Sequence, residues 1–358
     1  MEQYYRQQLE CMIDKVRPAD RAAMEASRRH WDQIAKPIDG LGLMEQMITK
    51  IAGVQGRENV RIDRKAVVVF CADNGIVAEG VTQTDSSVTA IVTANFAKGI
   101  ASVNRMARIA GAEVIPVDIG VAGNVDEPGV VVRKVACGTA NFRREPAMTM
   151  EQVLAAVYEG IRIASEMKDM GYDLLAVGEM GIGNTSTSSA VASVMLREPV
   201  EAVTGRGAGL SEEGLQRKIQ VIREALELHR PDPEKPLEVL SLVGGLDIAG
   251  MTGLMLGGAI YRIPVVLDGM ISAAAALLAK GLCPSVTDFL LASHMGKEPA
   301  CRLAMERLGL EPVIYGRLAL GEGTGAVMLL PLLEMAYEVY KENSTFEDIH
   351  VEAYEKFE

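Results

Sequence analysis

A glycine-rich segment at residues 178–189, GEMGIGNTSTSS, combines side chains that suit phosphate chemistry. Gly181 and Gly183 allow the backbone to approach a ligand closely, and Asn184 and Thr185 are residues that commonly begin a helix. No lysine follows the glycines as in a Walker loop, and the spacing is not that of a dinucleotide-binding loop. We predict a phosphate or ribose site at a helix N-terminus here. The alternative is a capped helix that binds no ligand.

Two glutamates lie in glycine-rich turns where a carboxylate could do chemistry. Glu179 follows the apolar run DLLAV, so its side chain is expected to point into a crevice or to accept hydrogen bonds from turn amides. Glu322 lies between Gly321 and Gly323, and no adjacent residue would pair with it. A carboxylate in such a turn is suited to act as a general base. An exposed glutamate in an ordinary helix-terminal turn is the alternative.

Lys218 occupies an unusual place on the helix predicted to begin at Ser211. It lies within the apolar stripe of that helix, which is formed by Leu215, Ile219, Ile222 and Leu226. A buried ammonium group is costly unless it meets an anion or reaches the surface along its aliphatic stem. Both interpretations, a lysine tip in solvent and a contact with a bound phosphate, stay open from these residues alone.

Neither the cysteines nor the histidines predict a metal centre or a disulfide framework. The five cysteines and four histidines are scattered, and no cysteine pair has C-x-x-C spacing. His294 and Glu298 have helical i, i+4 spacing, for which we expect a capping or surface role. No acidic pair precedes a threonine-rich phosphate loop, as would suit a magnesium-dependent enzyme that uses phosphoribosyl pyrophosphate. We expect neither a metal nor another cofactor.

Composition narrows the classes of function. The chain has 358 residues, of which 49% are hydrophobic, enough for one large domain and a smaller one. Its formal net charge of −12 and its aromatic content of 4% argue against a nucleic-acid-binding protein, which needs a basic face. The polar N-terminus and the interrupted apolar runs predict neither a leader nor a membrane span. We therefore expect a soluble, cytoplasmic protein that acts on small molecules.

Short apolar runs alternate with helical patterns between residues 65 and 295, which predicts a parallel, Rossmann-like α/β sheet with flanking helices. The predicted strands are residues 65–72, 113–119, 173–177, 238–243, 264–268 and 286–291. Thr149 and Gln152 form a T-x-x-Q capping box that begins one intervening helix, and Gly171 can end it. A long apolar helix is expected near the C-terminus, bent at Pro331. Glycine-rich turns follow several strands, at the edge where open α/β sheets bind ligands.

Several segments, in their order and spacing, resemble those of the nicotinate-nucleotide–dimethylbenzimidazole phosphoribosyltransferases of cobalamin biosynthesis. The resemblance runs from about residue 36 to residue 330, most of the chain. The segments are KPIDGLGLMEQM from residue 36, ADNGIVAEGVTQTDSSVTA from 72, GEMGIGNTS from 178, TGRGAGL from 204, GGLDIAGMTG from 244, VVLDGMISAAAALLA from 265, ASHMGKE from 292 and LGEGTGA from 320. Each is weak alone, whereas the set is highly specific.

The resemblance implies a reaction and residue roles. The expected activity transfers phosphoribose from nicotinate mononucleotide to 5,6-dimethylbenzimidazole or a related aromatic base. The products would be α-ribazole 5′-phosphate and nicotinate. Glu322 would be the catalytic general base, Glu179 would lie near the aromatic base, and Lys218 would reach the phosphate. The residues predicted to bind substrate are Thr82, Gln83, Ser86, Glu179, Gly181, Gly183, Asn184, Thr185, Gly205, Gly207, Lys218, Asp247, Asp268 and Gly269.

The resemblance also implies a homodimer whose subunits have two parts. Residues 61–310 would form a large parallel α/β catalytic domain. Residues 1–60 would join residues 311–358 in a small helical domain, since the first 60 residues have a helical pattern of mixed charge.

The chain departs from the usual family pattern at a few positions. Asn74 stands where histidine is more usual, Gly40 and Gly296 stand where serine is common, and a proline is common near Asp85. Because three of these positions lie in or near expected ligand segments, the preferred aromatic base stays open. Adenine or a phenol is an alternative acceptor. A nucleotide-binding protein without catalysis is the alternative outside enzymes.

Overall fold

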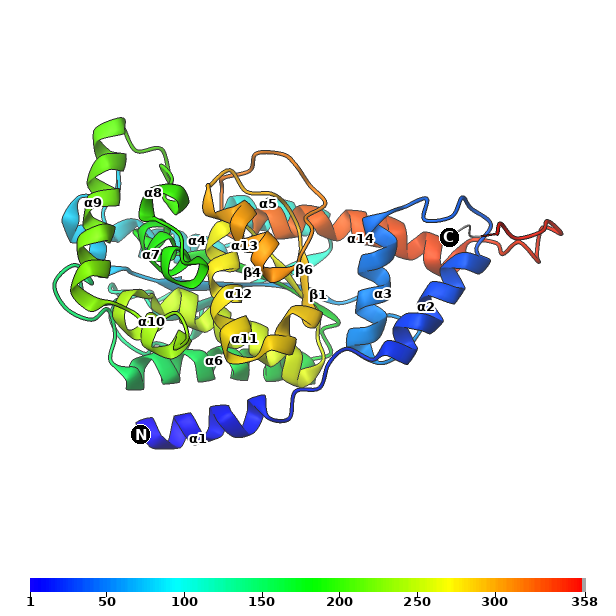
Figure 1. Cartoon of the computed structure of the whole chain (residues 1–358), viewed down its shortest axis with the longest axis horizontal. Coiled ribbons are helices and arrows are strands. Elements are labelled where there is room, and N and C mark those ends of the chain that lie inside the picture. The colour runs from blue at the N-terminus through cyan, green and yellow to red at the C-terminus, as the bar shows by residue number, and fades with distance from the viewer. Residues whose placement is uncertain (356–358) are drawn as a thin grey trace.

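The computed structural model describes residues 1–355, and within them a six-stranded parallel sheet forms the centre of the molecule (Figure 1). The strands are β1 (Lys65–Ala72), β2 (Ala112–Gly120), β3 (Val131–Val132), β4 (Leu174–Met180), β5 (Val265–Leu267) and β6 (Leu290–Ala292). Their order is β3-β2-β1-β4-β5-β6, so the direction of winding reverses between β1 and β4. Ligands of open α/β sheets bind beyond the carboxyl ends of the strands at such a point. The predicted parallel α/β fold is confirmed.

The helices around the sheet come from the connections between strands and from both chain ends. They are α4 (Ser87–Ala97), α5 (Ser102–Ile109), α6 (Met150–Asp169), α7 (Asn184–Leu196), α8 (Val200–Val203), α9 (Glu212–His229), α10 (Pro236–Val243), α11 (Leu246–Tyr261), α12 (Met270–Leu282), α13 (Ala300–Leu308) and α14 (Thr324–Glu342). Short 3₁₀ helices occur at η1 (Gly75–Glu79) and η2 (Pro284–Phe289).

Alternate residues of β1 face two different helical layers. Ala66, Val68 and Phe70 belong to a hydrophobic cluster that includes residues of α6, α11 and α12. Val67 and Val69 belong to a second cluster that includes residues of α5 and α14. A central strand of a sheet covered on both faces is apolar on both faces. This double burial accounts for the unbroken run KAVVVFCA.

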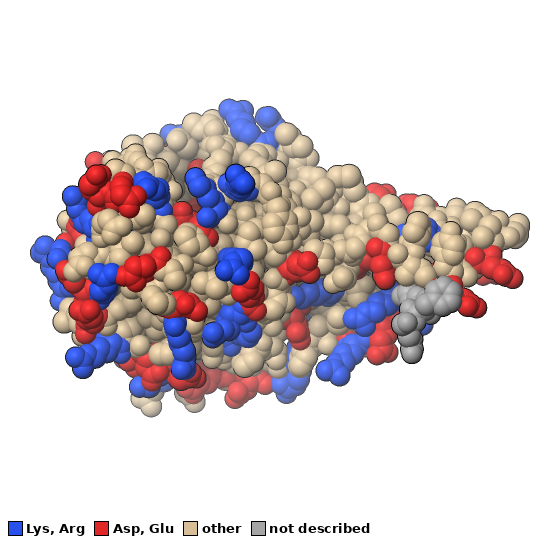
Figure 2. Space-filling view, turned by 45° about the horizontal axis from the view of Figure 1, so that its top comes forward, with Lys and Arg blue, Asp and Glu red and all other residues tan. Residues whose placement is uncertain are grey.

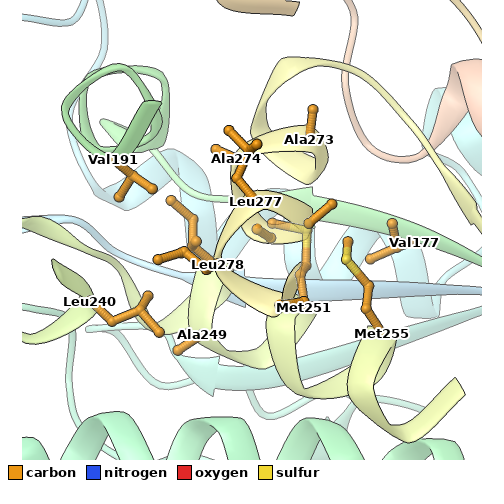
Figure 3. Packing of buried hydrophobic residues seen from close by; sticks show 14 of the residues in the cluster. Val177, Val191, Leu240, Ala249, Met251, Met255, Ala273, Ala274, Leu277 and Leu278 are labelled. Carbon is orange, nitrogen blue, oxygen red and sulfur yellow. The ribbon is translucent and has the colours of Figure 1, made fainter. Parts of the chain in front are cut away.

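The core beneath the sheet is filled by aliphatic side chains from neighbouring helices (Figure 3). Met251 and Met255 of α11 lie close to Val177 of β4, and Leu277 and Leu278 of α12 complete the cluster. Unbranched methionines can fill irregular gaps between a sheet and crossing helices. The strands are thereby anchored on a well-packed layer, which fixes where their carboxyl ends lie.

Glycines in α6 and α11 serve helix packing. A Cβ atom added at Gly160 would lie 2.1 Å from the carbonyl oxygen of Gly250, and one at Gly253 would lie 2.0 Å from that of Val157. The two helices can approach this closely only because these positions have no side chain. Much of the glycine content of GGLDIAGMTG therefore belongs to packing.

Two strand predictions are wrong in whole or in part. Residues 238–243 form most of helix α10, because Pro236 occupies its first turn, where proline favours a helix start. A short apolar run cannot by itself distinguish a buried strand from a buried helix. Residues 286–289 belong to η2, and only the last two residues of the predicted strand lie in β6. The short edge strand β3 was not predicted.

The capping box of α6 is confirmed. The N–H of Gln152 donates to Thr149 Oγ1 at 3.2 Å, and the N–H of Thr149 donates to Gln152 Oε1 at 2.8 Å. Gly171 follows the helix with φ +82°, a conformation that glycine adopts readily. Helix α14 contains Pro331 as expected, and its bend stays a prediction.

The N-terminal helices are divided between two places in the molecule (Figure 1). Helix α1 (Glu2–Ile13) packs along α6. Helices α2 (Arg21–Gln33) and α3 (Leu43–Gln55) pack together, and the end of α14 joins them through the rings of Trp31 and Tyr340, 4.9 Å apart. The domain limits at residues 61 and 310 stay a prediction.

The surface carries charges of both signs. On the face shown in Figure 2, acidic and basic side chains are interspersed on the left and along the lower side, while a broad area across the centre and top carries few charges. None of the helices described between residues 1 and 355 is both long and apolar enough to cross a bilayer.

Candidate active site

A cavity of about 350 Å³ opens beyond the carboxyl ends of β4, β5 and β6, as the glycine-rich turns predicted. Its wall includes most of residues 178–185, 268–272 and 318–324, together with residues 81–84 and 206–208. Apolar side chains on this wall are Met180, Ile182, Met270, Ile271, Leu318 and Leu320. The cavity therefore combines polar turns with a surface that can hold an aromatic ring.

The loop after β4 delivers the N-terminus of α7 to this cavity. Gly183 is the N-cap residue, with φ +95°, and no side chain caps the first turn. A Cβ at Gly181 would lie 2.4 Å from the carbonyl oxygen of Ala72 and 2.7 Å from Asp247 Oδ2, so only glycine fits there. The side-chain amide of Asn184 donates to Glu179 and, at 3.1 Å, to Asp247. The predicted phosphate loop is thus tied to the adjacent acids.

Lys218 is fully buried on α9 and does not extend to the surface. Its ammonium group donates to Thr185 Oγ1 at 2.9 Å, directly behind the start of α7. A Cβ at Gly207 would lie 2.7 Å from Thr185 Oγ1 and 3.4 Å from Lys218 Nζ. Burial lowers the pKa of Lys218 to about 8, although the nearby charge of Glu298 raises it. A cation with so few partners is poised to meet an anion.

Glu298 fixes the glycine-rich loop at residues 204–210. Its Oε1 accepts the N–H of Gly207 at 3.2 Å, while its Oε2 is buried without a hydrogen-bond partner. A Cβ at Gly205 would lie 2.1 Å from that same Oε2. The loop can therefore lie against Glu298 only with glycine at this position.

Glu179 and Asp247 form a buried acidic pair beside the start of α7. Burial, and then the charge of Asp247, raises the pKa of Glu179 to about 8. Burial raises the pKa of Asp247 to about 6, opposed by hydrogen bonds from Asn184 and the N–H of Ile248. Glu179 is therefore largely protonated near pH 7 and can donate a hydrogen bond into the cavity.

Glu322 lies in the turn that leads into α14, and its side chain lines the cavity. Gly321, Glu322 and Gly323 have φ values of +83°, +62° and +85°, so three consecutive residues are left-handed. Glu322 Oε2 accepts the N–H of Val103 at 3.4 Å. Burial raises the pKa of Glu322 above the ordinary glutamate value, and the charge of Asp268 adds to this rise. A carboxylate with a raised pKa is a better proton acceptor at neutral pH.

Asp268 and Gly269 follow β5 and line the same cavity. The carboxylate of Asp268 accepts N–H groups at the start of α14, from Gly323 at 3.2 Å, Gly325 at 2.8 Å and Ala326 at 3.1 Å. His294 lies beside it, with Nδ1 3.9 Å from Asp268 Oδ1.

The remaining predicted residues lie around the rim or behind the wall. Thr82 and Gln83 line the cavity, and the Gln83 amide donates to the carbonyl of Gly209. Ser86 precedes α4 and lies outside the cavity wall. Lys218, Gly205 and Asp247 also lie behind rather than on the wall. Their assignment to substrate binding stays a prediction.

Comparison with known proteins places this site in a family. Residues 16–351 match the family described as phosphoribosyltransferase. The nicotinate-nucleotide–dimethylbenzimidazole phosphoribosyltransferase of Acetivibrio thermocellus is 45% identical over 332 residues, 93% of this chain and 95% of that protein. The enzyme of the same name from Clostridium acetobutylicum is 43% identical, over 97% of this chain and 98% of that protein. The crystal structure of CobT from Thermus thermophilus matches with a TM-score of 0.88 at 42% identity, over 92% of this chain and 99% of that chain. This chain belongs to that phosphoribosyltransferase family.

Three of the positions at which we expected the chain to depart from the family pattern lie in three different environments. Asn74 is buried behind the α7 loop, where its Oδ1 accepts the hydroxyl of Thr187 at 2.7 Å. Gly296 lines the cavity, and its N–H donates to Cys301 Sγ at 3.2 Å. Asp85 is exposed and accepts the N–H of Ser87 at 2.9 Å. Of these three positions, Gly296 is the one that lies on the cavity wall.

The sequence prediction for His294 and Glu298 is wrong in part. Residues 294–298 are not helical, and His294 is buried in the cavity wall rather than at the surface. Its position follows from β6, which ends at Ala292 and carries His294 towards Asp268. The short apolar run before it was a signal that these residues follow a strand.

Among residues 1–355, no group of three or more His, Cys, Asp or Glu side chains could hold a metal ion.

Proposed function

We propose that this phosphoribosyltransferase transfers the 5-phosphoribosyl group of nicotinate mononucleotide to 5,6-dimethylbenzimidazole or a closely related aromatic base. The relatives named above carry this activity in their names. One observation in the structure supports this proposal. The start of α7, which is suited to bind a phosphate, and Glu322, whose pKa is raised, line the same cavity.

Direct contacts connect these two parts of the cavity. Lys218 donates to Thr185, and the neighbouring Asn184 donates to Glu179. A Cβ at Gly321, the residue before Glu322, would lie 2.7 Å from Glu179 Oε1. A phosphate held at the start of α7 would therefore place its ribose between that helix and the Glu322 turn. The apolar wall beside them would hold the aromatic base.

The donor needs little help to lose its base. Nicotinate is bound to the ribose as a pyridinium, so breaking the bond from C1′ to the pyridinium nitrogen returns an electron pair to that nitrogen and neutralises it.

Because the reaction releases no pyrophosphate, we expect no metal requirement. Activity should therefore survive exhaustive chelation, and an enzyme that stays inactive until Mg²⁺ is restored would contradict this.

The acceptor attacks C1′ through its unprotonated ring nitrogen, from the face opposite to nicotinate. The new bond inverts C1′ and leaves a positive charge shared with the N–H of the acceptor ring. Glu322 takes that proton, which neutralises the product. Protonated Glu179 can hold the aromatic acceptor in place by hydrogen bonding.

A direct assay tests the proposal and its alternatives. The protein is incubated with nicotinate mononucleotide and, separately, with dimethylbenzimidazole, adenine, a phenol or no acceptor. Nicotinate release and the new nucleotide are followed by chromatography and mass spectrometry. We expect the fastest turnover with dimethylbenzimidazole. Preference for adenine or phenol would change the substrate, and binding of the mononucleotide without any nicotinate release would support a non-catalytic nucleotide-binding protein.

A homodimer in the cytoplasm completes the proposal. Exposed apolar side chains at Ile91, Ile100 and Ile109, on and between α4 and α5, support a contact with a second copy. Light scattering at micromolar concentration should give twice the mass of the chain, and a monomeric mass would count against the dimer.

A further inference from the structure

The carboxylate of Asp268 accepts hydrogen bonds from another part of the cavity wall, the start of α14. Its Oδ2 accepts the N–H of Gly323, and its Oδ1 accepts those of Gly325 and Ala326. These are the N-cap, N2 and N3 positions of α14. The N-cap residue is glycine and has no side chain to satisfy them. The capping carboxylate therefore comes from the end of a different element, β5.

The turn that Asp268 holds is unfavourable by itself. Glu322 is the middle one of three consecutive left-handed residues, and a non-glycine residue is sterically strained in this conformation. Such a conformation persists only where surrounding contacts enforce it. The first N–H group that Asp268 accepts belongs to Gly323, the residue after Glu322. These hydrogen bonds therefore fix the direction of the backbone immediately after Glu322.

The opposite side of the turn is held by close packing against the sheet. A Cβ at Gly178 would lie 2.6 Å from the carbonyl oxygen of Glu322, and one at Gly323 would lie 2.8 Å from Val67 Cγ1. The turn therefore packs between Val67 of β1 and Gly178 of β4 on one side and the Asp268 carboxylate on the other. Only the side chain of Glu322 is left to project along the cavity wall.

We propose that Asp268 is a positioning residue for this reaction: by capping α14 from strand β5, it holds Glu322 in the left-handed turn that aims its carboxylate at the acceptor base. This inference rests on the proposed function, since it takes Glu322 as the proton acceptor. The other titratable groups around this turn are Glu179 on β4, whose pKa the charge of Glu322 helps to raise, and His294 after β6, which lies beside Asp268.

A variant series, Asp268→Asn and Asp268→Ala, separates the hydrogen bonds from the charge. The asparagine side chain would still offer one oxygen to the N–H groups of Gly325 and Ala326, whereas alanine would remove all three bonds. We expect kcat to fall on the order of 10²-fold in Asp268→Ala, the effect of a misplacement near 1 Å, and less in Asp268→Asn. The KM for nicotinate mononucleotide should change little, because Lys218 and the α7 loop are untouched.

The pH profile gives a readout that general loss of structure would not. The charge of Asp268 raises the pKa of Glu322. In Asp268→Asn, the acidic limb of kcat should therefore move to lower pH. Hydrogen exchange measured by mass spectrometry should also become faster in the peptide that contains residues 319–327, and only slightly elsewhere.

A matched control is available at another helix. Asp20 caps α2 by accepting the N–H of Ala23 at 3.0 Å, far from the cavity in sequence and in a different part of the molecule. Because Asp20 is exposed and accepts one N–H, Asp20→Asn and Asp20→Ala should lower thermal stability less than the Asp268 variants do, and they should leave kcat and its pH profile unchanged.

The outcomes distinguish this proposal from the one beneath it. If wild-type protein produces no nucleotide in the acceptor assay, the proposed function fails and the exchange measurement still reports whether Asp268 holds the turn. If wild-type protein is active, an Asp268→Asn enzyme with unchanged kcat and a raised KM for the acceptor would make Asp268 a binding residue and overturn the positioning role. Unchanged exchange at residues 319–327 in both variants would overturn it as well.

Discussion

Two of the helices that begin at the cavity, α7 and α14, follow the same G-x-G pattern but have different surroundings. Helix α7 follows GIG and opens with Asn184, while α14 follows GEG and opens with Thr324. Both have a left-handed glycine as N-cap, Gly183 with φ +95° and Gly323 with φ +85°, and neither cap supplies a side-chain hydrogen bond. From their own residues alone, both would be candidates for an anion site.

The two helix starts differ in the side chain that another element places beside them. At α14, the carboxylate of Asp268 already accepts the N–H groups of the first turn. At α7, the N-cap glycine supplies no side-chain hydrogen bond, no carboxylate among residues 1–355 accepts the N–H groups of the first turn, and the buried Lys218 donates to Thr185 in that turn. A resident anion therefore fixes the turn that carries Glu322, whereas a resident cation leaves α7 ready for an anion from outside. On the proposals made above, the same kind of helix start would position Glu322 at α14 and bind a phosphate at α7.

The largest effect is expected from the side chain that the α14 turn presents. Glu322→Gln keeps the shape of the side chain and its acceptor for Val103, but it cannot take a proton. Turnover should fall on the order of 10²–10⁴-fold, while binding of both substrates changes little. Steady-state kinetics and calorimetry measure the two quantities separately.

The acidic limb of the pH profile sharpens this result. Burial raises the pKa of Glu322, so wild-type turnover should fall as pH decreases through that raised value, and this limb should vanish in Glu322→Gln. Glu179→Gln is the control, because we expect it to weaken acceptor binding more than turnover. Near-normal turnover in Glu322→Gln would place the base elsewhere, with Glu179 the first candidate.

The next effect is expected at the cation behind α7. Lys218→Ala should weaken binding of nicotinate mononucleotide by about 1.5–3 kcal/mol, the value of a charge-assisted hydrogen bond. Binding of dimethylbenzimidazole alone should hardly change. Titration calorimetry with each ligand separates the two, and an equal loss for both would indicate general damage rather than a lost phosphate contact.

Sequence reasoning found the segments of this site because their chemistry is local. The glycines at 181 and 183, the lysine within an apolar stripe and the glutamate between glycines are visible along the chain. The burial of Lys218 excludes the interpretation in which its ammonium group lies in solvent, whereas its contact with a phosphate stays a prediction. The central strands were predicted from continuous apolar runs, which strands buried on both faces require.

The parts that sequence reasoning missed depend on contacts between distant segments. Asp268 was expected to bind substrate, and nothing near it in sequence shows that it caps a helix that begins at Thr324. His294 and Glu298 were treated as a helical pair, although β6 and the loop at residues 204–210 determine their places. Residues 238–243 were predicted as a strand because a short buried helix and a buried strand can have the same apolar composition.

The smallest effect concerns the pKa of Lys218, the cation behind α7, and how the charge of Glu298 changes it. The pKa of Lys218 is about 8, lowered by burial and raised by Glu298. A phosphate needs the charged ammonium, so affinity for nicotinate mononucleotide should decline as pH rises through about 8. Glu298→Gln keeps an acceptor for the N–H of Gly207 but removes the charge, so this decline should begin at lower pH. At a pH well below the pKa of Lys218 in both proteins, binding should be equal or slightly tighter in the variant, because one negative charge near the phosphate is gone. Calorimetry across this pH range checks both statements. An unshifted decline would mean that Glu298 only anchors its loop, and no decline in wild type would mean that the phosphate does not depend on Lys218.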